Sequence, residues 1–138
     1  MIIDATDLII GRMGTVVAKK ALNGETINIV NCGKAIMTGD KKGLLLEYKR
    51  KFDMGTHTTG PYVPKSTERF VKRAIRGMLP YKKPRGREAF SRIKCFKDVP
   101  EEFANEKIET IEVASFKKLR TLKYLKVEDI CKFLGGKV

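Results

Sequence analysis

The stretch MIIDATDLIIGRMGTVVAKKALNGETINIVN, residues 1–31, decides the fold class of this chain. It begins with an apolar strand over residues 1–5 and ends with an alternating, β-branched strand over residues 26–31. Between them lies a predicted helix that ends at Asn23-Gly24 and that buries one face, formed by Met13, Val16, Val17 and Ala21. A strand, a helix and a strand within about thirty residues predict a βαβ unit with parallel strands and a right-handed crossover.

The rest of the chain predicts shorter elements and no second domain, repeat or low-complexity segment. In order, we expect an extended piece over residues 35–37, a helix over 44–51 capped by Asp40, an exposed loop over 53–64, a helix over 66–79 capped by Ser66 with Pro80 beyond it, a short helix over 86–92, a strand over 93–96, and a final amphipathic helix ending at Gly135-Gly136. The predicted buried stripe of the helix over 66–79 is Phe70, Val71, Ala74, Ile75, Met78 and Leu79.

The composition is typical of a single folded domain. The chain has 138 residues, of which 42% are hydrophobic, enough for a core. The N-terminus resembles no signal peptide, and no apolar run is long enough to span a membrane, so we expect a soluble, intracellular protein. Cys32, Cys95 and Cys131 lie far apart among apolar residues, and His57 is the only histidine; this pattern predicts buried free thiols and no zinc site.

The charge of the chain is concentrated in its middle third. The formal net charge is +13, and residues 41–94 carry sixteen Lys or Arg against four acids, a net +12, whereas the two flanks are nearly neutral. Such a block favours a polyphosphate partner, because each phosphate that is neutralised releases a condensed counterion. Nucleic acid is the favoured partner, and an anionic membrane surface or an acidic protein is the alternative.

Two glycine-containing turns resemble nucleotide-binding loops but are incomplete. Gly11-Arg12-Met13-Gly14 lacks the first glycine of a dinucleotide fingerprint, which favours a close-packed turn. Residues 38–43 lack the Ser or Thr of a phosphate loop, although a helix start beside Lys41 and Lys42 can hold a backbone phosphate. His57 has no catalytic partner at a recognisable spacing, and Asp4 and Asp7 suit turn or cap positions. We therefore predict no enzyme, cofactor, metal site or small-molecule substrate; an RNA-modifying or nucleotide-using enzyme is the rival class.

The segment Lys82-Lys83-Pro84-Arg85-Gly86-Arg87 places four cations close together just beyond the basic helix. Glycine permits a close backbone approach, proline limits the entropy lost on ordering, and arginine binds phosphate through two parallel hydrogen bonds. Tyr81 beside this segment offers a face on which an unpaired base can stack. With no DNA-reading motif visible, recognition of folded RNA fits better than sequence-specific DNA binding, and a DNA-compacting protein is a further alternative.

Several segments, in this order, resemble one known family. Asp4-Ala5 with Ile10-Gly11-Arg12 matches its N-terminal Asp-Ala…Leu-Gly-Arg, and residues 30–39 (VNCGKAIMTG) match its Val-Asn-Ala-x-Lys-x-x-x-Thr-Gly. Arg76-Gly77-Met78-Leu79-Pro80, followed by Gly86-Arg87, is similar to its signature. The family is that of large-subunit ribosomal protein thirteen in the bacterial naming. The resemblance covers residues 1 to about 103, and residues 60–65 (GPYVPK) resemble the archaeal and eukaryotic branch.

The resemblance implies a three-layer α/β/α domain around a small, mainly parallel sheet, here with basic loop and helical extensions. It also implies a structural protein of the cytoplasmic ribosome that binds large-subunit rRNA, is recruited early in assembly and lies beside neighbouring large-subunit proteins. Cys32 and Gly33 replace the usual Ala-Glu of the family, which leaves RNA binding undisturbed. The cations predicted to contact RNA are Arg12, Lys34, Lys41, Lys42, Lys49, Arg50, Lys51, Lys65, Arg69, Lys72, Arg73, Arg76, Lys82, Lys83, Arg85 and Arg87.

Overall fold

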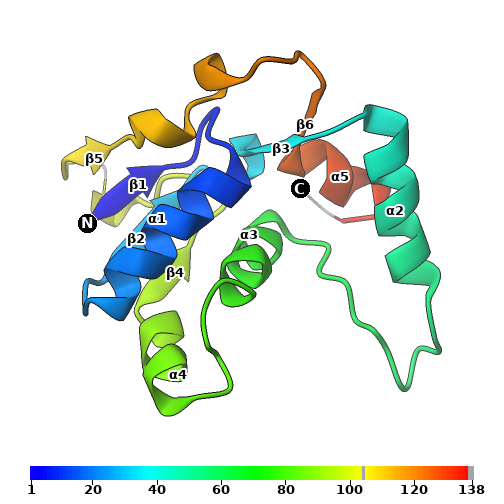
Figure 1. Ribbon diagram of the computed structural model, residues 1–138, viewed down its shortest axis with the longest axis horizontal. Coiled ribbons are helices and arrows are strands. Elements are labelled where there is room, and N and C mark those ends of the chain that lie inside the picture. Colours follow the sequence, from blue (N-terminus) through cyan, green and yellow to red (C-terminus); the bar gives the residue numbers. More distant parts are fainter. Residues whose placement is uncertain (104, 137–138) are drawn as a thin grey trace.

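The structure, a computed structural model, describes residues 1–103 and 105–136 (Figure 1). The helices and strands of this part of the chain are, in order, β1 (Ile2–Asp4), α1 (Ile10–Leu22), β2 (Ile27–Val30), β3 (Ile36–Thr38), α2 (Lys41–Asp53), α3 (Thr67–Arg76), α4 (Pro84–Ser91), β4 (Ile93–Cys95), β5 (Ile108–Glu109), β6 (Tyr124–Lys126) and α5 (Val127–Phe133). The predicted βαβ unit is present as β1, α1 and β2. The helix predicted over residues 44–51 begins three residues earlier, and the one predicted over 86–92 begins two residues earlier.

The main sheet has four parallel strands in the order β4-β2-β1-β5. In its register Ile29 lies opposite Ile3 on one side and opposite Cys95 on the other. Consecutive strand residues point to opposite faces, and Ile2, Ile3, Ile29 and Val30 are nevertheless all buried. Both faces of the sheet are therefore covered, with α1 lying across one of them (Figure 1). The α/β class and the mainly parallel sheet are confirmed.

A second, two-stranded sheet is a feature that the sequence did not predict as such. β3 corresponds to the expected extended piece over residues 35–37, but it pairs antiparallel with β6, so that Met37 lies opposite Leu125. The tail beyond residue 103 was expected to contain one helix, and β5 and β6 were missed. Segments of two or three residues are too short to show an alternation strong enough to identify a strand. The final helix, α5, is confirmed, with Val127, Ile130 and Cys131 buried.

The structure corrects three predictions about helix α3: where it ends, how it is capped, and which residues are buried. It ends at Arg76 instead of Leu79, and the chain continues in tight turns in which the Met78 amide donates to the Ile75 carbonyl. The Ser66 side chain makes no capping hydrogen bond. Met78 does not belong to the buried stripe: it is 40% exposed. Its sulfur instead covers Gly14 of α1, 2.8 Å from where a Cβ at that glycine would stand.

Gly86 permits the closest backbone approach in this region. A Cβ at this position would stand 2.1 Å from the carbonyl oxygen of Pro80, a contact that requires the backbone to move. We expect Gly86→Ala to lower the free energy of unfolding by about 1–3 kcal/mol, the usual cost of overpacking. Gly11→Ala is the matched control, because nothing lies within 4 Å of the Cβ position of Gly11. This substitution reduces the backbone freedom of the unfolded chain and should stabilise the folded protein by up to about 1 kcal/mol. Thermal melting of both variants measures the difference, and equal midpoints would contradict the close packing of Gly86.

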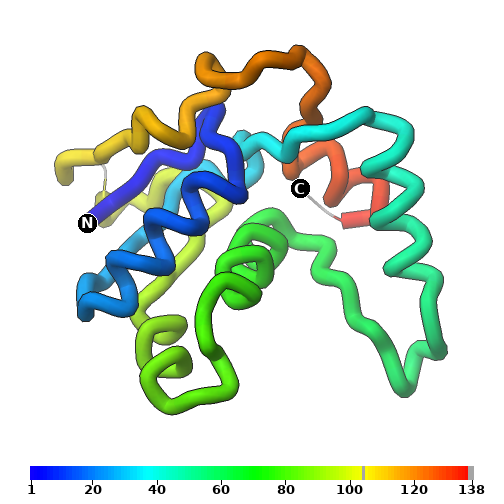
Figure 2. Tube along the Cα trace, in the orientation of Figure 1, coloured from blue at the N-terminus to red at the C-terminus, as the bar shows by residue number. Residues whose placement is uncertain are grey.

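Helix α2 stands apart from the sheet at the other end of the molecule (Figure 1). Its predicted cap is confirmed, because the Asp40 carboxylate accepts a hydrogen bond of 3.3 Å from the Gly43 amide. None of its residues is buried. Figure 2 shows the chain leaving α2, turning, and returning as an extended segment to the start of α3. This returning segment forms one wall of the site described next.

Candidate nucleic-acid interface

Helix α3 separates its apolar and basic residues onto opposite sides. Phe70, Val71 and Ile75 are buried, and Phe70 packs at 5.1 Å, centroid to centroid, from Tyr48 of α2. The opposite side carries four cations, of which only one is half-buried: Arg69, Lys72, Arg73 and Arg76. Because α3 is fixed to the core through its apolar side, the cations are presented from a rigid element.

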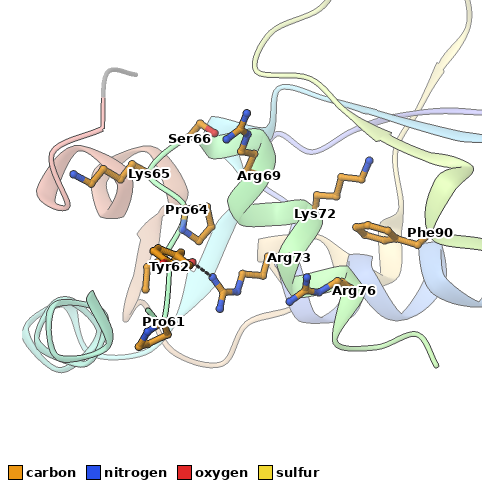
Figure 3. Close-up of a pocket in the computed structure, with 11 residues that line it drawn as sticks. Pro61, Tyr62, Pro64, Lys65, Ser66, Arg69, Lys72, Arg73, Arg76 and Phe90 are labelled. Atoms are coloured by element: carbon orange, nitrogen blue, oxygen red, sulfur yellow. Dashed lines mark hydrogen bonds between the residues drawn. The ribbon is translucent and has the colours of Figure 1, made fainter. Parts of the chain in front are cut away.

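These four cations line an open groove of about 880 Å³ (Figure 3). The extended segment over residues 61–66 runs along the other side of the groove, and Phe90 of α4 closes one end. Lys65 adds a fifth cation to the lining. All lining residues belong to the described part of the chain, and none of them is Asp or Glu. The charged residues of the lining are therefore all positive, and their number suits an anion longer than a single ion.

Apolar and backbone contacts hold the groove cations in place. The Arg73 guanidinium donates a hydrogen bond to the Tyr62 carbonyl, which joins α3 to the extended segment (Figure 3). The Lys72 ammonium lies 4.9 Å from the centroid of the Phe90 ring, and the Arg76 guanidinium carbon lies 5.1 Å from that of Tyr81. Such cation–π contacts orient a positive charge without neutralising it.

The groove cations form no ion pair within residues 1–103 and 105–136. The ion pairs in that part of the chain are Lys20–Glu25, Lys51–Glu47, Arg92–Glu88 and Lys132–Glu128. A hydrogen bond from Lys51 lowers the pKa of the Glu47 carboxyl. The positive charge of Arg69, Lys72, Arg73 and Arg76 is thus available to an external anion.

The other predicted contact residues lie outside this groove. Lys82, Lys83, Arg85 and Arg87 are exposed around the turn between α3 and α4 and the start of α4. The exposed cations of α2 are Lys41, Lys42, Lys49 and Arg50, while Lys51 is half-buried and faces α3 across a smaller cavity. Arg12, in the first turn of α1, and Lys34, after β2, are exposed and line none of the cavities described here. The structure therefore brings together five predicted residues in the groove, with Lys51 near them.

The sequence reading missed several residues that line these cavities. Tyr62 and Phe90 line the groove, and Lys94 joins Arg69, Lys72 and the acidic Glu68 around an adjoining cavity of about 300 Å³. Aromatic side chains that stand within a basic stretch and outside any buried stripe are the signal that could have identified Tyr62 and Phe90. Tyr81 was predicted as a stacking face; it is 41% exposed, and Arg76 already lies over its ring.

The residues weighed as catalytic or cofactor sites have structural surroundings. Asp4 accepts hydrogen bonds from the Thr6 amide, the Thr6 hydroxyl and the Asn31 amide, at 2.7–3.0 Å. Partial burial acts to raise its pKa, but these hydrogen bonds prevail and lower it. The prediction of a close-packed turn at Gly11–Gly14 is wrong in part: these residues lie in α1, where Gly14 is buried beneath Met78 but Gly11 is exposed, with nothing within 4 Å of its Cβ position. His57 is exposed in the loop after α2, and no metal-ligand cluster occurs in the portion of the chain with described placement.

Two of the three cysteines are buried free thiols as expected. Burial raises the pKa of Cys131 to about 11. The neighbouring Cys95 side chain and burial raise the pKa of Cys32. Cys95 is only half-buried, because it lies at the end of the edge strand β4 and lines the cavity beside Lys94. Among the described helices, none combines the length and apolar character that crossing a bilayer requires.

The fold and the site thus define a class of protein. It is a small α/β domain with cations gathered on one helix and on the segment that faces it. The family profile described as Ribosomal protein L13 matches residues 1–102. The chain is 44% identical over 135 residues to "Large ribosomal subunit protein uL13" of Archaeoglobus fulgidus, covering 97% of this chain and 86% of the relative. It is 42% identical over 137 residues to the protein of the same name from Methanosarcina barkeri, covering 99% and 98%.

The chain belongs to the ribosomal protein L13 family. The resemblance seen in the sequence is confirmed, and the relatives just described are archaeal, in agreement with the branch suggested by residues 60–65. The similarity also extends further than expected. Resemblance had been recognised only to about residue 103, whereas these relatives match nearly the whole chain. The tail that forms β5, β6 and α5 therefore lies within the similarity to these relatives, although beyond the residues that the family profile matches.

Proposed function

We propose that this chain is a structural, non-catalytic protein of the large ribosomal subunit that binds large-subunit rRNA, and that residues 1–138 act as one rRNA-binding domain. The observation that carries the proposal is the row of unpaired cations on α3 above an acid-free groove. The names of the relatives support the choice of the ribosome among possible RNA partners. The protein works in the cytoplasm as part of the ribosome, beside neighbouring large-subunit proteins, and joins early in assembly.

Phosphate neutralisation is the proposed mechanism. RNA segments that converge in a folded particle repel one another through their phosphates, and cations held between them allow close approach. Arg69, Arg73 and Arg76 each present a planar guanidinium that can bind a phosphate through two parallel hydrogen bonds. Contacts of this kind set register and orientation and carry no base sequence. The protein therefore recognises the shape of folded rRNA, with backbone contacts supplying most of the affinity.

The basic tip, defined as Lys82, Lys83, Arg85 and Arg87, extends this surface. Leu79 is buried just before the tip and Gly86 packs against Pro80 within it, so the tip leaves the core at a fixed place. All four side chains are exposed. Anchoring of this kind lowers the ordering cost of binding RNA.

Replacing all four tip cations by glutamine should leave the fold intact and impair both rRNA binding and incorporation into the large subunit. Each phosphate contact contributes about 0.9 to the slope of log K against log salt, so the slope should shrink by up to about 4. A matched control removes the same charge from the tail, at the exposed residues Lys107, Lys117, Lys118 and Lys123. Thermal melting, filter binding to large-subunit rRNA and ribosome sedimentation give the readouts.

The two variants distinguish local contact from overall charge. Equal losses of affinity would mean that net charge matters and that the place of the charge does not. If the tip variant melts normally, binds rRNA with unchanged affinity and enters ribosomes at the normal level, the tip is only solvated surface.

A further inference from the structure

A second cavity, of about 320 Å³, lies between α2 and α3 beside the groove. Its lining is mostly apolar, from the extended segment and α3: Pro61, Val63, Pro64, Phe70 and Ala74. Tyr48, Lys51 and Arg73 complete the lining, and no Asp or Glu is among these described residues. An apolar interior with two cations suits a ligand that is flat and hydrophobic at one end and anionic at the other.

The interior of the cavity contains two aromatic rings. Phe70 is 5% exposed and Tyr48 is half-buried, and their rings meet at an interplanar angle of 49°. Burial raises the pKa of Tyr48, so its hydroxyl stays protonated and available as a hydrogen-bond donor. Aromatic faces and hydrogen-bonding groups are the features by which proteins hold an unstacked nucleobase.

The two cations stand on opposite walls. Lys51 projects from α2, with its ammonium 2.5 Å from Glu47 and 5.1 Å from the centroid of the Tyr48 ring. Arg73 projects from α3 and lines both this cavity and the larger groove. A phosphate at Arg73 would therefore join a ligand in the cavity to a chain lying in the groove.

We propose that this cavity receives one unstacked nucleotide of the bound RNA, with its base against Tyr48 and Phe70 and a phosphate at Arg73. The proposal rests on the proposed RNA-binding function and adds a base-contacting subsite to it. A base inside a duplex is stacked on both sides and cannot enter. The nucleotide comes from a bulge, a loop or another unpaired position, and the cavity makes the protein selective for RNA that displays one.

The wall formed by α2 allows a base to enter. α2 has no buried residue, and its packing on α3 includes the tilted contact of Tyr48 with Phe70. The α3 wall, in contrast, is fixed by the buried Phe70, Val71 and Ile75. One rigid wall and one lightly packed wall can admit purines and pyrimidines alike, so the subsite recognises an unstacked base and not a particular sequence.

The first test titrates the full chain with adenosine 5′-monophosphate, uridine 5′-monophosphate and ribose 5-phosphate while the resonances of Tyr48, Phe70 and Val63 are followed by NMR. Both mononucleotides should shift these resonances, and ribose 5-phosphate should bind about 5- to 150-fold more weakly because it lacks the stacking base. Equal binding of ribose 5-phosphate, or no saturable binding of either mononucleotide at millimolar concentration, overturns the proposal.

The second test fills the cavity without changing the charge. Ala74→Leu places a larger apolar side chain in the lining, and it should weaken binding to large-subunit rRNA by about 5- to 150-fold while the salt slope stays unchanged. Val113→Leu is the matched control, since Val113 is 61% exposed and lines neither cavity. If Ala74→Leu does not fold, Tyr48→Leu removes a stacking ring in its place.

The outcomes separate this proposal from the function on which it rests. If a folded Ala74→Leu variant binds rRNA with unchanged affinity, the proposed nucleotide subsite is wrong. A normal salt slope in the same titration would still support the proposed rRNA-binding function. If the unaltered chain shows no affinity for rRNA at all, the proposed function itself fails.

Discussion

Raising the salt concentration from 50 to 200 mM should weaken the binding of this protein to large-subunit rRNA by about 10³–10⁵-fold, if about six to ten phosphates are contacted. The expectation follows from the unpaired cations of the α3 groove together with those of the basic tip and α2. Each neutralised phosphate releases counterions, and added salt opposes that release. Filter binding or fluorescence anisotropy over a salt series measures the slope.

A groove variant locates the source of that slope. Replacing Arg69, Arg73 and Arg76 by glutamine removes three cations and should reduce the slope by up to about 3. Its melting temperature must be measured as well, because Arg73 also donates to the Tyr62 carbonyl. If the rRNA affinity of the unaltered protein hardly changes with salt, the cations of residues 41–94 are not the main contact with RNA.

Ile29→Ala should lower the free energy of unfolding by about 2–5 kcal/mol. Ile29 is 0% exposed in β2, an inner strand that pairs with both β1 and β4. Truncation leaves a cavity that neighbouring strands cannot readily close, so the transfer and cavity costs add. Chemical denaturation followed by circular dichroism measures the effect.

The matched control for this truncation is Leu122→Ala. Leu122 is 88% exposed, and its replacement should change stability by no more than about 0.5 kcal/mol. An unchanged midpoint for Ile29→Ala would show that Ile29 is not a core residue, and equal losses in both variants would contradict the assignment of the core to the main sheet.

The parts of the fold that were predictable are those with local signals. The alternation around Ile29, the helical period of Met13 and Val17, and the Asp40 cap each act over a few residues, and the structure confirms them. β5 and β6 were not predictable, because strands of two or three residues exist only through their partners in the sheet. The end of α3 was misplaced because Met78 continues the apolar period while packing on Gly14 of a different helix.

The candidate site also has one part that could be predicted from local sequence and one part that could not. The basic side of α3 follows from spacing alone, since Arg69, Lys72, Arg73 and Arg76 share one side of a helix. The groove does not, because the segment over residues 61–66 and Phe90 reach α3 only through tertiary folding. Charge marks the region of the chain where a polyphosphate binds, and packing decides where cavities form.

Crosslinking the protein to RNA in its native cells, then sequencing the attached RNA and mapping the crosslinked peptides, tests the account as a whole. We expect reads concentrated in large-subunit rRNA, with crosslinked peptides from residues 61–76 and 82–87. Reads dominated by other RNAs, or crosslinks confined to the charge-balanced tail beyond residue 95, would contradict it.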